Sequence, residues 1–194
     1  NTFDQRLTYD NQSLILTVKE VLDYFKLINK PKKIDAEAGT REETPLFDYQ
    51  SFREAWINAC VHTTWTENIP PSVYMYDDRI EVVSYGGLPF GLSKEGFYTG
   101  TSKPVNNRLF NIFITCDFTE QSGHGIPRIV DHYGREAFSF NDGILKVTIP
   151  YGYVPDYVLA RQAKNKIIDI LTDNQRNVLH YLAENPYSSL QAVA

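Results

Sequence analysis

The pattern of apolar and polar positions predicts helices near both ends of the chain. Between residues 52 and 62, apolar residues recur at spacings of three and four, which is typical of a helix that buries one side. The same spacing predicts a helix over 17–27, which starts with a Thr-x-x-Glu capping box at Thr17. The Asn-Lys-Pro sequence at 29–31 ends this helix. Residues 161–171 and 174–184 carry shorter helical patterns.

Two pairs of short β-rich runs predict antiparallel hairpins. Residues 73–76 and 80–83 are separated by Asp-Asp-Arg, and residues 138–140 and 144–149 by Asn-Asp-Gly. Loops of this length and composition favour tight turns between paired strands. We therefore expect at least these two strand pairs.

Other stretches carry no periodicity. Residues 32–46 indicate a strand or extended arm followed by a loop, and residues 151–155 a linker. Residues 90–104 are rich in Gly, Ser, Thr and Lys. Because an ordered loop of this length is often the cover of a site, we predict a lid there.

Composition narrows the class of protein. The 194 residues are 42% hydrophobic and 13% aromatic, which indicates a folded globular chain. A net charge of −5 argues against general nucleic-acid binding, and we interpret the basic patches at 30–33 and 161–166 as solvated faces. The sequence shows no signal peptide and no apolar run that could cross a bilayer, so we expect a cytoplasmic protein without membrane contact. Cys60 and Cys116 are expected to be reduced.

The end of the chain predicts part of a DNA-binding module. A helix, a short turn and a second helix over residues 172–194 are typical of the start of a winged helix-turn-helix. Its recognition helix and wing would lie past Ala194, so any DNA contact would come from that missing remainder. The chain also begins without methionine, and we expect it to be a piece of a longer protein.

The predicted helix over 52–62 carries the main candidate chemistry. Glu54, Asn58 and His62 are four residues apart and therefore share one face. A carboxylate can act as a base, and a carboxamide can offer its oxygen to a cation. This pairing suits a site for a phosphate with Mg²⁺. The alternative is an amphipathic helix whose polar residues face solvent or cap a neighbour.

Two glycine-rich corners are the other candidates. Gly86 and Gly87 follow a predicted strand and allow the backbone to approach a phosphate or nucleobase, although an ordinary turn is the commoner explanation for such a pair. Gly123 and Gly125 precede a helix predicted from Pro127 in its first turn, and a helix N-terminus attracts anions. His124 lies between them and is a candidate ligand or general base, without acids or cysteines at metal spacing.

Four motifs occur in a fixed order between residues 45 and 150. They are R-E-A-x-x-N-A-x-V-H at 53–62, D-D-R-I-E-V at 77–82, G-G-L-P at 86–89 with Gly91-Leu92, and E-x-x-G-x-G-I-x-R-I at 120–129. Together they resemble the putative ATP-dependent DNA helicase RecG C-terminal domain family. This is a histidine-kinase-like ATPase module of bacterial and archaeal regulators, often preceded by a Schlafen/AlbA-type domain and followed by a winged helix. The chain has no helicase motor motif, so strand separation is not expected.

The resemblance implies an α+β fold. Its architecture would be a two-layer α/β sandwich of the histidine-kinase-like ATPase type, with a mixed, mostly antiparallel sheet backed by helices and a C-terminal helical segment. The implied domains are an ATPase-like domain over 1–150 with an N-terminal helical arm, a linker helix over 151–171, and the truncated start of a winged helix-turn-helix over 172–194.

The resemblance also implies roles for individual residues, with ATP and Mg²⁺ as ligands. Glu54 would activate water as the catalytic residue, and Asn58 would hold Mg²⁺ through the nucleotide. Gly86 and Gly87 would form the first glycine box and face the base, and Gly123 to Gly125 would form the second and cradle the phosphates. Residues 92–103 would form the lid. Ser84 occupies the position of the superfamily's adenine-contacting aspartate. The complete nucleotide-binding set is Asn58, His62, Ser84, Gly86, Gly87, Ser102, Lys103, Gly123, His124 and Gly125.

Two functions follow from the resemblance. The first is an ATP-binding sensor module, with weak ATPase activity, in a homodimeric bacterial transcriptional regulator linked to DNA. The alternative is a scaffold of the same fold that binds no nucleotide. Such a scaffold would mediate dimerisation and carry the winged-helix domain. Binding of ATP by the folded chain distinguishes the two.

Overall fold

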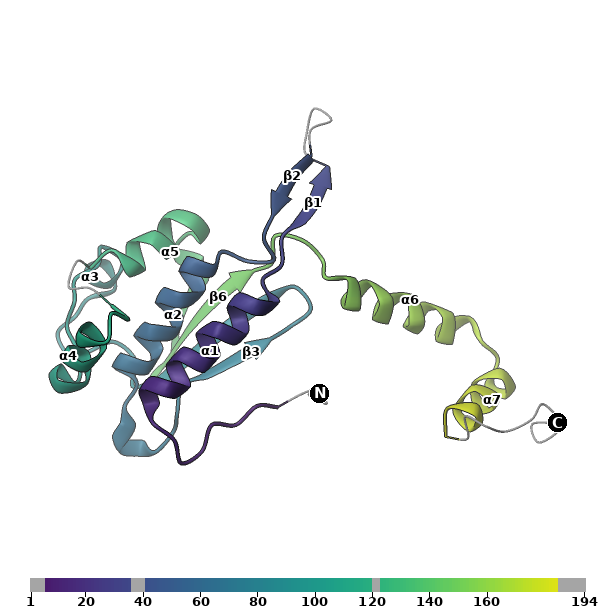
Figure 1. The fold of residues 1–194 in the computed structure, drawn as a ribbon, viewed down its shortest axis with the longest axis horizontal. Helices are drawn as coiled ribbons and strands as arrows, with labels where there is room; N and C mark the ends of the chain where they lie inside the picture. The colour runs from purple at the N-terminus through teal and green to yellow at the C-terminus, as the bar shows by residue number, and fades with distance from the viewer. Residues whose placement is uncertain (1–5, 36–40, 120–122, 185–194) are drawn as a thin grey trace. The chain divides into compact units, whose positions relative to one another are not determined.

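The computed structural model describes residues 6–35, 41–119 and 123–184. The chain divides into two compact units, Asn1–Tyr153 and Val154–Ala194. The predicted α+β class is confirmed, because the described residues form helices and two antiparallel sheets (Figure 1). The assignment of named domains to 1–150, 151–171 and 172–194 stays a prediction.

The main sheet belongs to the first unit. It consists of β3 (Ser72–Met75), β4 (Arg79–Tyr85), β5 (Phe138–Asn141) and β6 (Ile144–Pro150) in the order β3-β4-β6-β5. All three strand pairings are antiparallel, and both predicted hairpins are confirmed. In the second hairpin, Asp142 and Gly143 have φ angles of 48° and 74°, which a tight two-residue turn requires. The long connection from β4 to β5 builds most of the candidate site.

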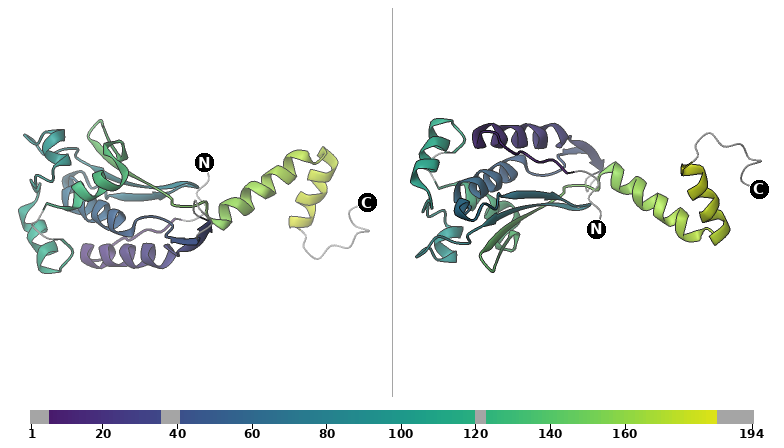
Figure 2. Two further views of the ribbon diagram at one scale, coloured as in Figure 1. Left: turned by 90° about the horizontal axis from the view of Figure 1, so that it is seen from above. Right: turned by 90° about the horizontal axis from the view of Figure 1, so that it is seen from below.

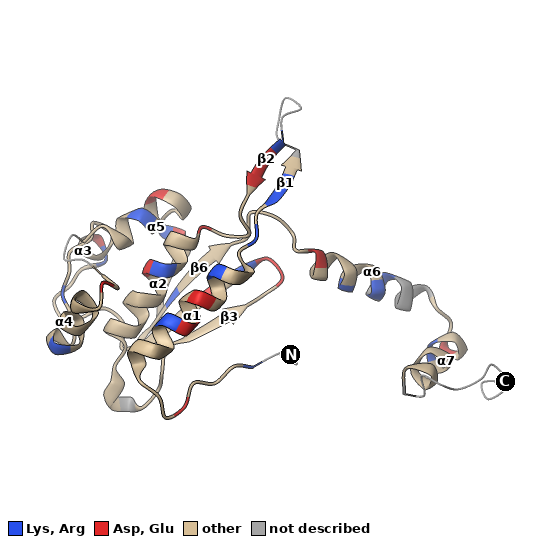
Figure 3. Ribbon diagram, in the orientation of Figure 1, with Lys and Arg blue, Asp and Glu red and all other residues tan. Residues whose placement is uncertain are grey.

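Helices α1 (Leu14–Ile28) and α2 (Tyr49–His62) cover one face of this sheet (Figure 2). Their apolar faces meet in a cluster of aromatic rings, in which Phe25 stacks on Phe52 with centroids 4.1 Å apart. Phe47 packs edge-on against both rings. The exposed side of α1 carries both basic and acidic residues, Lys19, Glu20, Asp23 and Lys26 (Figure 3). The aromatic cluster therefore fixes α2 to the rest of the unit.

The start of α1 differs from the prediction. The helix begins at Leu14 with Ser13 as its N-cap residue, so the capping box at Thr17 is wrong. Leu14 and Ile15 pack against the buried core. That burial extends the helix by one turn at its N-terminal end, because tertiary packing overrides a local capping signal.

Asp48 caps α2 and gives the first testable prediction. Its carboxylate accepts a hydrogen bond of 2.8 Å from the Ser51 backbone N–H. Burial alone raises the pKa of Asp48, but the Ser51 hydrogen bonds and the charge of Arg128 hold it below its ordinary value. Asp48→Ala should lower the free energy of unfolding at pH 7 by about 1 kcal/mol. Since the folded pKa is lowered, this contribution is complete above the unfolded pKa of about 3.9 and is lost as pH falls below it.

Urea denaturation of wild type and Asp48→Ala between pH 3 and pH 7 measures this difference. The difference between the two variants should shrink as pH falls toward 3, because the carboxyl of the unfolded chain is protonated before that of the folded chain. A difference that stays constant across this range would contradict the charged cap.

The remaining elements of the first unit surround the helix layer and the sheet. They are β1 (Lys32–Asp35) and β2 (Arg41–Thr44), which form a separate hairpin, the short helices α3 (Lys94–Tyr98), α4 (Asn107–Thr115) and α5 (Gly125–Tyr133), and the 3-10 turns η1 (Trp65–Glu67) and η2 (Arg135–Ala137). Helix α3 lies within the predicted lid, and α5 begins at Gly125, slightly before the predicted start.

The second unit contains α6 (Asp156–Ile170) and α7 (Asp173–Glu184). Helix α6 begins before the predicted residue 161, and the further helix expected near residue 190 lies outside the described residues. Among the helices described here, none combines the length and the apolar character needed to cross a membrane. Cys60 and Cys116 are free thiols, as predicted.

Candidate functional site

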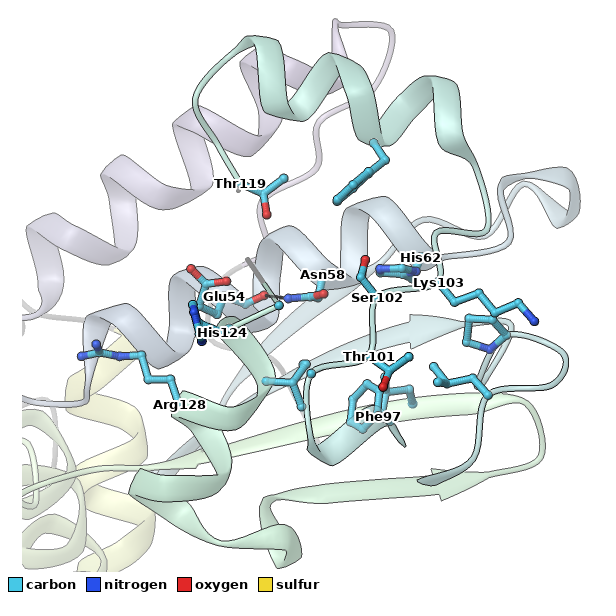
Figure 4. Close-up of a pocket in the computed structure, with 18 of the residues that line it drawn as sticks. Glu54, Asn58, His62, Phe97, Thr101, Ser102, Lys103, Thr119, His124 and Arg128 are labelled. Atoms are coloured by element: carbon cyan, nitrogen blue, oxygen red, sulfur yellow. Dashed lines mark hydrogen bonds between the residues drawn. The ribbon is translucent and has the colours of Figure 1, made fainter. Parts of the chain in front are cut away.

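A cavity of about 400 Å³ lies in the first unit, beside α2 (Figure 4). Its walls come from the polar face of α2, the corner after β4, the lid segment (residues 92–103), Phe110 with residues 117–119, the start of α5 with the two residues before it, and Leu145 of β6. These segments are far apart in the sequence, and the fold brings them together at one place.

Helix α2 contributes all three polar residues predicted from their spacing. Glu54, Asn58 and His62 line the cavity, while Phe52 and Trp56 on the other side of the helix are buried. The Asn58 Nδ2 donates a hydrogen bond of 2.8 Å to the Glu54 carbonyl oxygen. Within the described residues the Asn58 Oδ1 accepts no hydrogen bond, so this oxygen is available to a ligand.

The carboxylate of Glu54 is held from two sides. Arg53 Nη1 lies 3.1 Å from Glu54 Oε1, and both side chains are only about a quarter exposed or less, at 26% and 21%. On the other side, a Cβ atom on Gly125 would overlap the carboxylate, so only glycine allows this close approach. The carboxylate therefore lies directly against the first residue of α5.

Arg53 also ties the end of α4 to α2. Its Nη2 donates hydrogen bonds to the carbonyl oxygens of Asp117 and Phe118, at 3.3 and 2.7 Å. Asp117 has a φ angle of 57°, so the chain turns sharply here before it runs toward Gly123. Arg53 belongs to the first motif, but nothing in the sequence spacing reveals which carbonyl groups its side chain contacts.

The second glycine corner supplies a helix N-terminus. Gly123, His124 and Gly125 all line the cavity, and α5 begins at Gly125 without a side-chain cap. The first N–H groups of such a helix have no partner within it and carry a partial positive charge. Glu54 and this helix start thus form a polar end of the cavity that suits an anion together with a cation.

Apolar side chains also line the cavity, among them Leu88, Pro89, Leu92, Phe97 and Leu145. Phe97 lies toward the end of the cavity that is away from Glu54 and His124 (Figure 4). Leu88, Pro89 and Leu92 belong to the motif that contains the first glycine corner, but the motif gave a role only to its glycines. Phe97 and Leu145 lie in separate elements, and no motif marks them. An apolar lining of this kind suits a flat ring such as a nucleobase.

His62, Ser102 and Lys103 lie toward the same end as Phe97 (Figure 4). Burial lowers the pKa of His62, so its imidazole is neutral at neutral pH. Its Nδ1 atom is buried and has no hydrogen-bond partner among the described residues. The Lys103 ammonium donates a hydrogen bond to the Phe90 carbonyl oxygen, which ties the end of the lid segment to the corner after β4.

Two predicted residues do not line the cavity. Ser84 is only 6% exposed and, by strand alternation, lies on the same face of β4 as the buried Ile80 and Val82. Gly86 has a φ angle of 115°, and a Cβ there would overlap the Thr64 side chain. Its N–H donates to the Gly143 carbonyl oxygen at 2.7 Å. Of the first glycine corner, only Gly87 lines the cavity.

The donor set fits Mg²⁺ brought in by a phosphate ligand. No cluster of three or more His, Cys, Asp or Glu side chains that could hold a metal occurs among residues 6–35, 41–119 and 123–184. Mg²⁺ usually keeps several waters and takes only one or two protein oxygens in addition to substrate phosphates. The Oδ1 of Asn58 and the nearby Glu54 carboxylate are oxygens of that kind.

Comparison with known proteins gives a family match over part of the chain. Residues 69–145 match the family model described as "Putative ATP-dependent DNA helicase recG C-terminal". This match indicates an ATPase-like module and confirms the family recognised from the motifs, while the Schlafen/AlbA-type and winged-helix parts of that recognition stay predictions. The matched range includes both glycine corners and the lid segment but begins after α2, so the roles of Glu54 and Asn58 depend on geometry.

A solved structure has a similar fold. The DIP2311 protein from Corynebacterium diphtheriae superposes with a TM-score of 0.60 at 18% sequence identity. The similarity covers 79% of this chain and 32% of that protein, so the chain spans about a third of its length. At this identity the likeness concerns the fold alone. A search of curated proteins returns no match for the chain.

Proposed function

We propose that the first unit binds ATP with Mg²⁺ and acts as the sensor module of a cytoplasmic bacterial transcriptional regulator. One observation carries the nucleotide part of this proposal. The carboxylate and amide of α2 line the same cavity as the uncapped start of α5 and the apolar side chains of Leu88, Phe97 and Leu145. A nucleotide has a matching division between a charged phosphate chain and a flat base.

Each part of the site has a role in this proposal. The N–H groups at the start of α5 bind phosphate oxygens, and Leu88, Phe97 and Leu145 enclose the base. Asn58 Oδ1 holds Mg²⁺, which neutralises phosphate charge when it is bound with the nucleotide. Glu54, oriented by Arg53, accepts a proton from the water that attacks the terminal phosphate.

The regulatory part of the proposal is supported by the second unit. Helices α6 and α7 are separated by a short turn, in which the Thr172 backbone N–H and hydroxyl both donate hydrogen bonds to the Gln175 side-chain oxygen. In this proposal α6 is the linker helix, and α7 is the first helix of the winged helix-turn-helix that the sequence predicts over residues 172–194. We propose that a winged helix completed beyond these helices contacts DNA, and that two copies of the chain form a homodimer to meet paired half-sites.

Asn58→Ala provides the direct test of nucleotide binding. Calorimetry should show that wild type binds Mg-ATP and that the variant binds at least about tenfold more weakly, because it loses an oxygen contact to a charged group. The effect of removing Mg²⁺ should also shrink in the variant. Asn111→Ala, which changes an exposed residue of α4, is the matched control and should bind like wild type.

The competing function is a scaffold that binds no nucleotide. It is favoured by Ser84, which stands where the resemblance implies an adenine-contacting aspartate. Ser84 has no carboxylate, is buried and does not line the cavity. Thermal unfolding separates the two functions, since a ligand present at a hundred times its Kd stabilises the folded state by about 2.7 kcal/mol. A well-folded wild type whose melting temperature does not change in millimolar Mg-ATP would support the scaffold.

A further inference from the structure

Helix α3 of the lid segment is fixed by an ion pair that lies outside the cavity. The Arg135 guanidinium, in η2, makes two hydrogen bonds to the Glu95 carboxylate, at 2.9 and 2.7 Å. The same guanidinium lies over the Tyr98 ring, with its carbon 4.9 Å from the centroid. Arg135 is thus bound to α3 by a bidentate ion pair and a cation–π contact at once.

The other side of α3 packs on strand β5. The Phe97 ring lies edge-on to Phe138 and Phe140, with centroid distances of 5.3 and 5.4 Å. The Lys94 ammonium lies 5.0 Å from the centre of the Phe140 ring. Since Phe97 also lines the cavity, the position of α3 determines where this wall of the cavity stands.

The segment that follows α3 is fixed at the opposite end of α5. Gly100 and Gly123 both have positive φ angles, of 82° and 67°, and a Cβ on either residue would overlap the carbonyl oxygen of the other. Their backbones are therefore in direct contact. As a result, residues 95–100 are attached near both ends of α5, to Arg135 after its C-terminus and to Gly123 before its N-terminus.

We infer that Arg135 is a positioning residue that clamps α3 over the cavity and thereby slows the release of a bound nucleotide. This inference depends on the proposed nucleotide binding. A ligand between the lid segment and α2 can leave once residues 95–100 separate from α5, and the Glu95–Arg135 pair resists that movement. Both side chains are more than half exposed, at 64% and 53%, so the pair contributes modestly.

Two measurements on the full chain test the clamp. The first is hydrogen exchange of residues 94–98 in ligand-free protein, and the second is the dissociation rate of a fluorescent ATP analogue with Mg²⁺. Arg135→Ala and Glu95→Ala should each raise the exchange rate and the dissociation rate about fivefold. The double variant should show no further increase in either rate. The exchanged pair Glu95→Arg with Arg135→Glu should restore most of the wild-type behaviour. Lys19→Ala, which removes an exposed ion pair on α1, is the control.

The outcomes distinguish the clamp from nucleotide binding itself. Unchanged exchange of residues 94–98 in Arg135→Ala would overturn the clamp, and so would faster exchange without faster dissociation. If wild type binds no nucleotide, the proposed function and the slowed release of nucleotide both fail. The ligand-free exchange still tests whether Arg135 positions α3: acceleration supports that positioning, and no change overturns it.

Discussion

Glu54→Gln should leave ATP binding nearly intact and lower the rate of ATP hydrolysis by about a hundredfold or more. Glutamine has the shape of glutamate and fits against Gly125, where a larger backbone substituent would overlap. It cannot accept a proton from water, because its amide is not basic. The wild-type carboxylate is already oriented by Arg53, so loss of the base rather than loss of order would dominate the effect.

The measurement combines calorimetry with release of inorganic phosphate under saturating Mg-ATP. Glu20→Gln on α1 is the matched control, since it makes the same chemical change on an exposed surface. Both variants should bind ATP like wild type, and only Glu54→Gln should stop phosphate release. Equal turnover by wild type and Glu54→Gln would remove Glu54 from the mechanism.

Phe52→Ala should be the most destabilising single change in the first unit. The side chain is fully buried and stacks on Phe25, with Phe47 edge-on to both. Truncation of a buried phenylalanine costs about 3–5 kcal/mol, because apolar burial is lost and a cavity remains. The predicted drop in melting temperature is about 6–20 °C for a chain of this size.

Chemical denaturation of Phe52→Ala beside Leu27→Ala measures this effect. Leu27 is on α1 and is 70% exposed, so its truncation should change the free energy of unfolding by less than about 0.5 kcal/mol. Similar losses for the two variants would show that the aromatic cluster does not hold α2 in place.

The site has two halves that rest on different support. The glycine corners and the lid segment lie within residues 69–145, where the family match applies. Glu54 and Asn58 lie on α2, before that range, and their proposed roles follow from the cavity that they share with the start of α5. Substitutions in the two halves therefore test different parts of the proposal.

Much of the local structure could be predicted from the sequence. The Asn-Asp-Gly turn fixed the second hairpin, because few residues tolerate the positive φ angles of Asp142 and Gly143. The four-residue spacing of Glu54, Asn58 and His62 also predicted one shared face, and that face lines the cavity. Both signals are local, since turn type and helical period depend on a few neighbouring residues.

The sequence by itself thus determined the paired strands, the amphipathic α2 and the polar stripe on it. Only the tertiary structure decided which distant groups meet that stripe: Arg53 with the carbonyl groups after α4, Gly125 against Glu54, and Arg135 with Glu95. It also decided that Ser84 and Gly86 lie outside the cavity lining, although their motif predicted contact with a base. The physical reason is that such contacts depend on how whole elements pack, and packing joins residues that no sequence period relates.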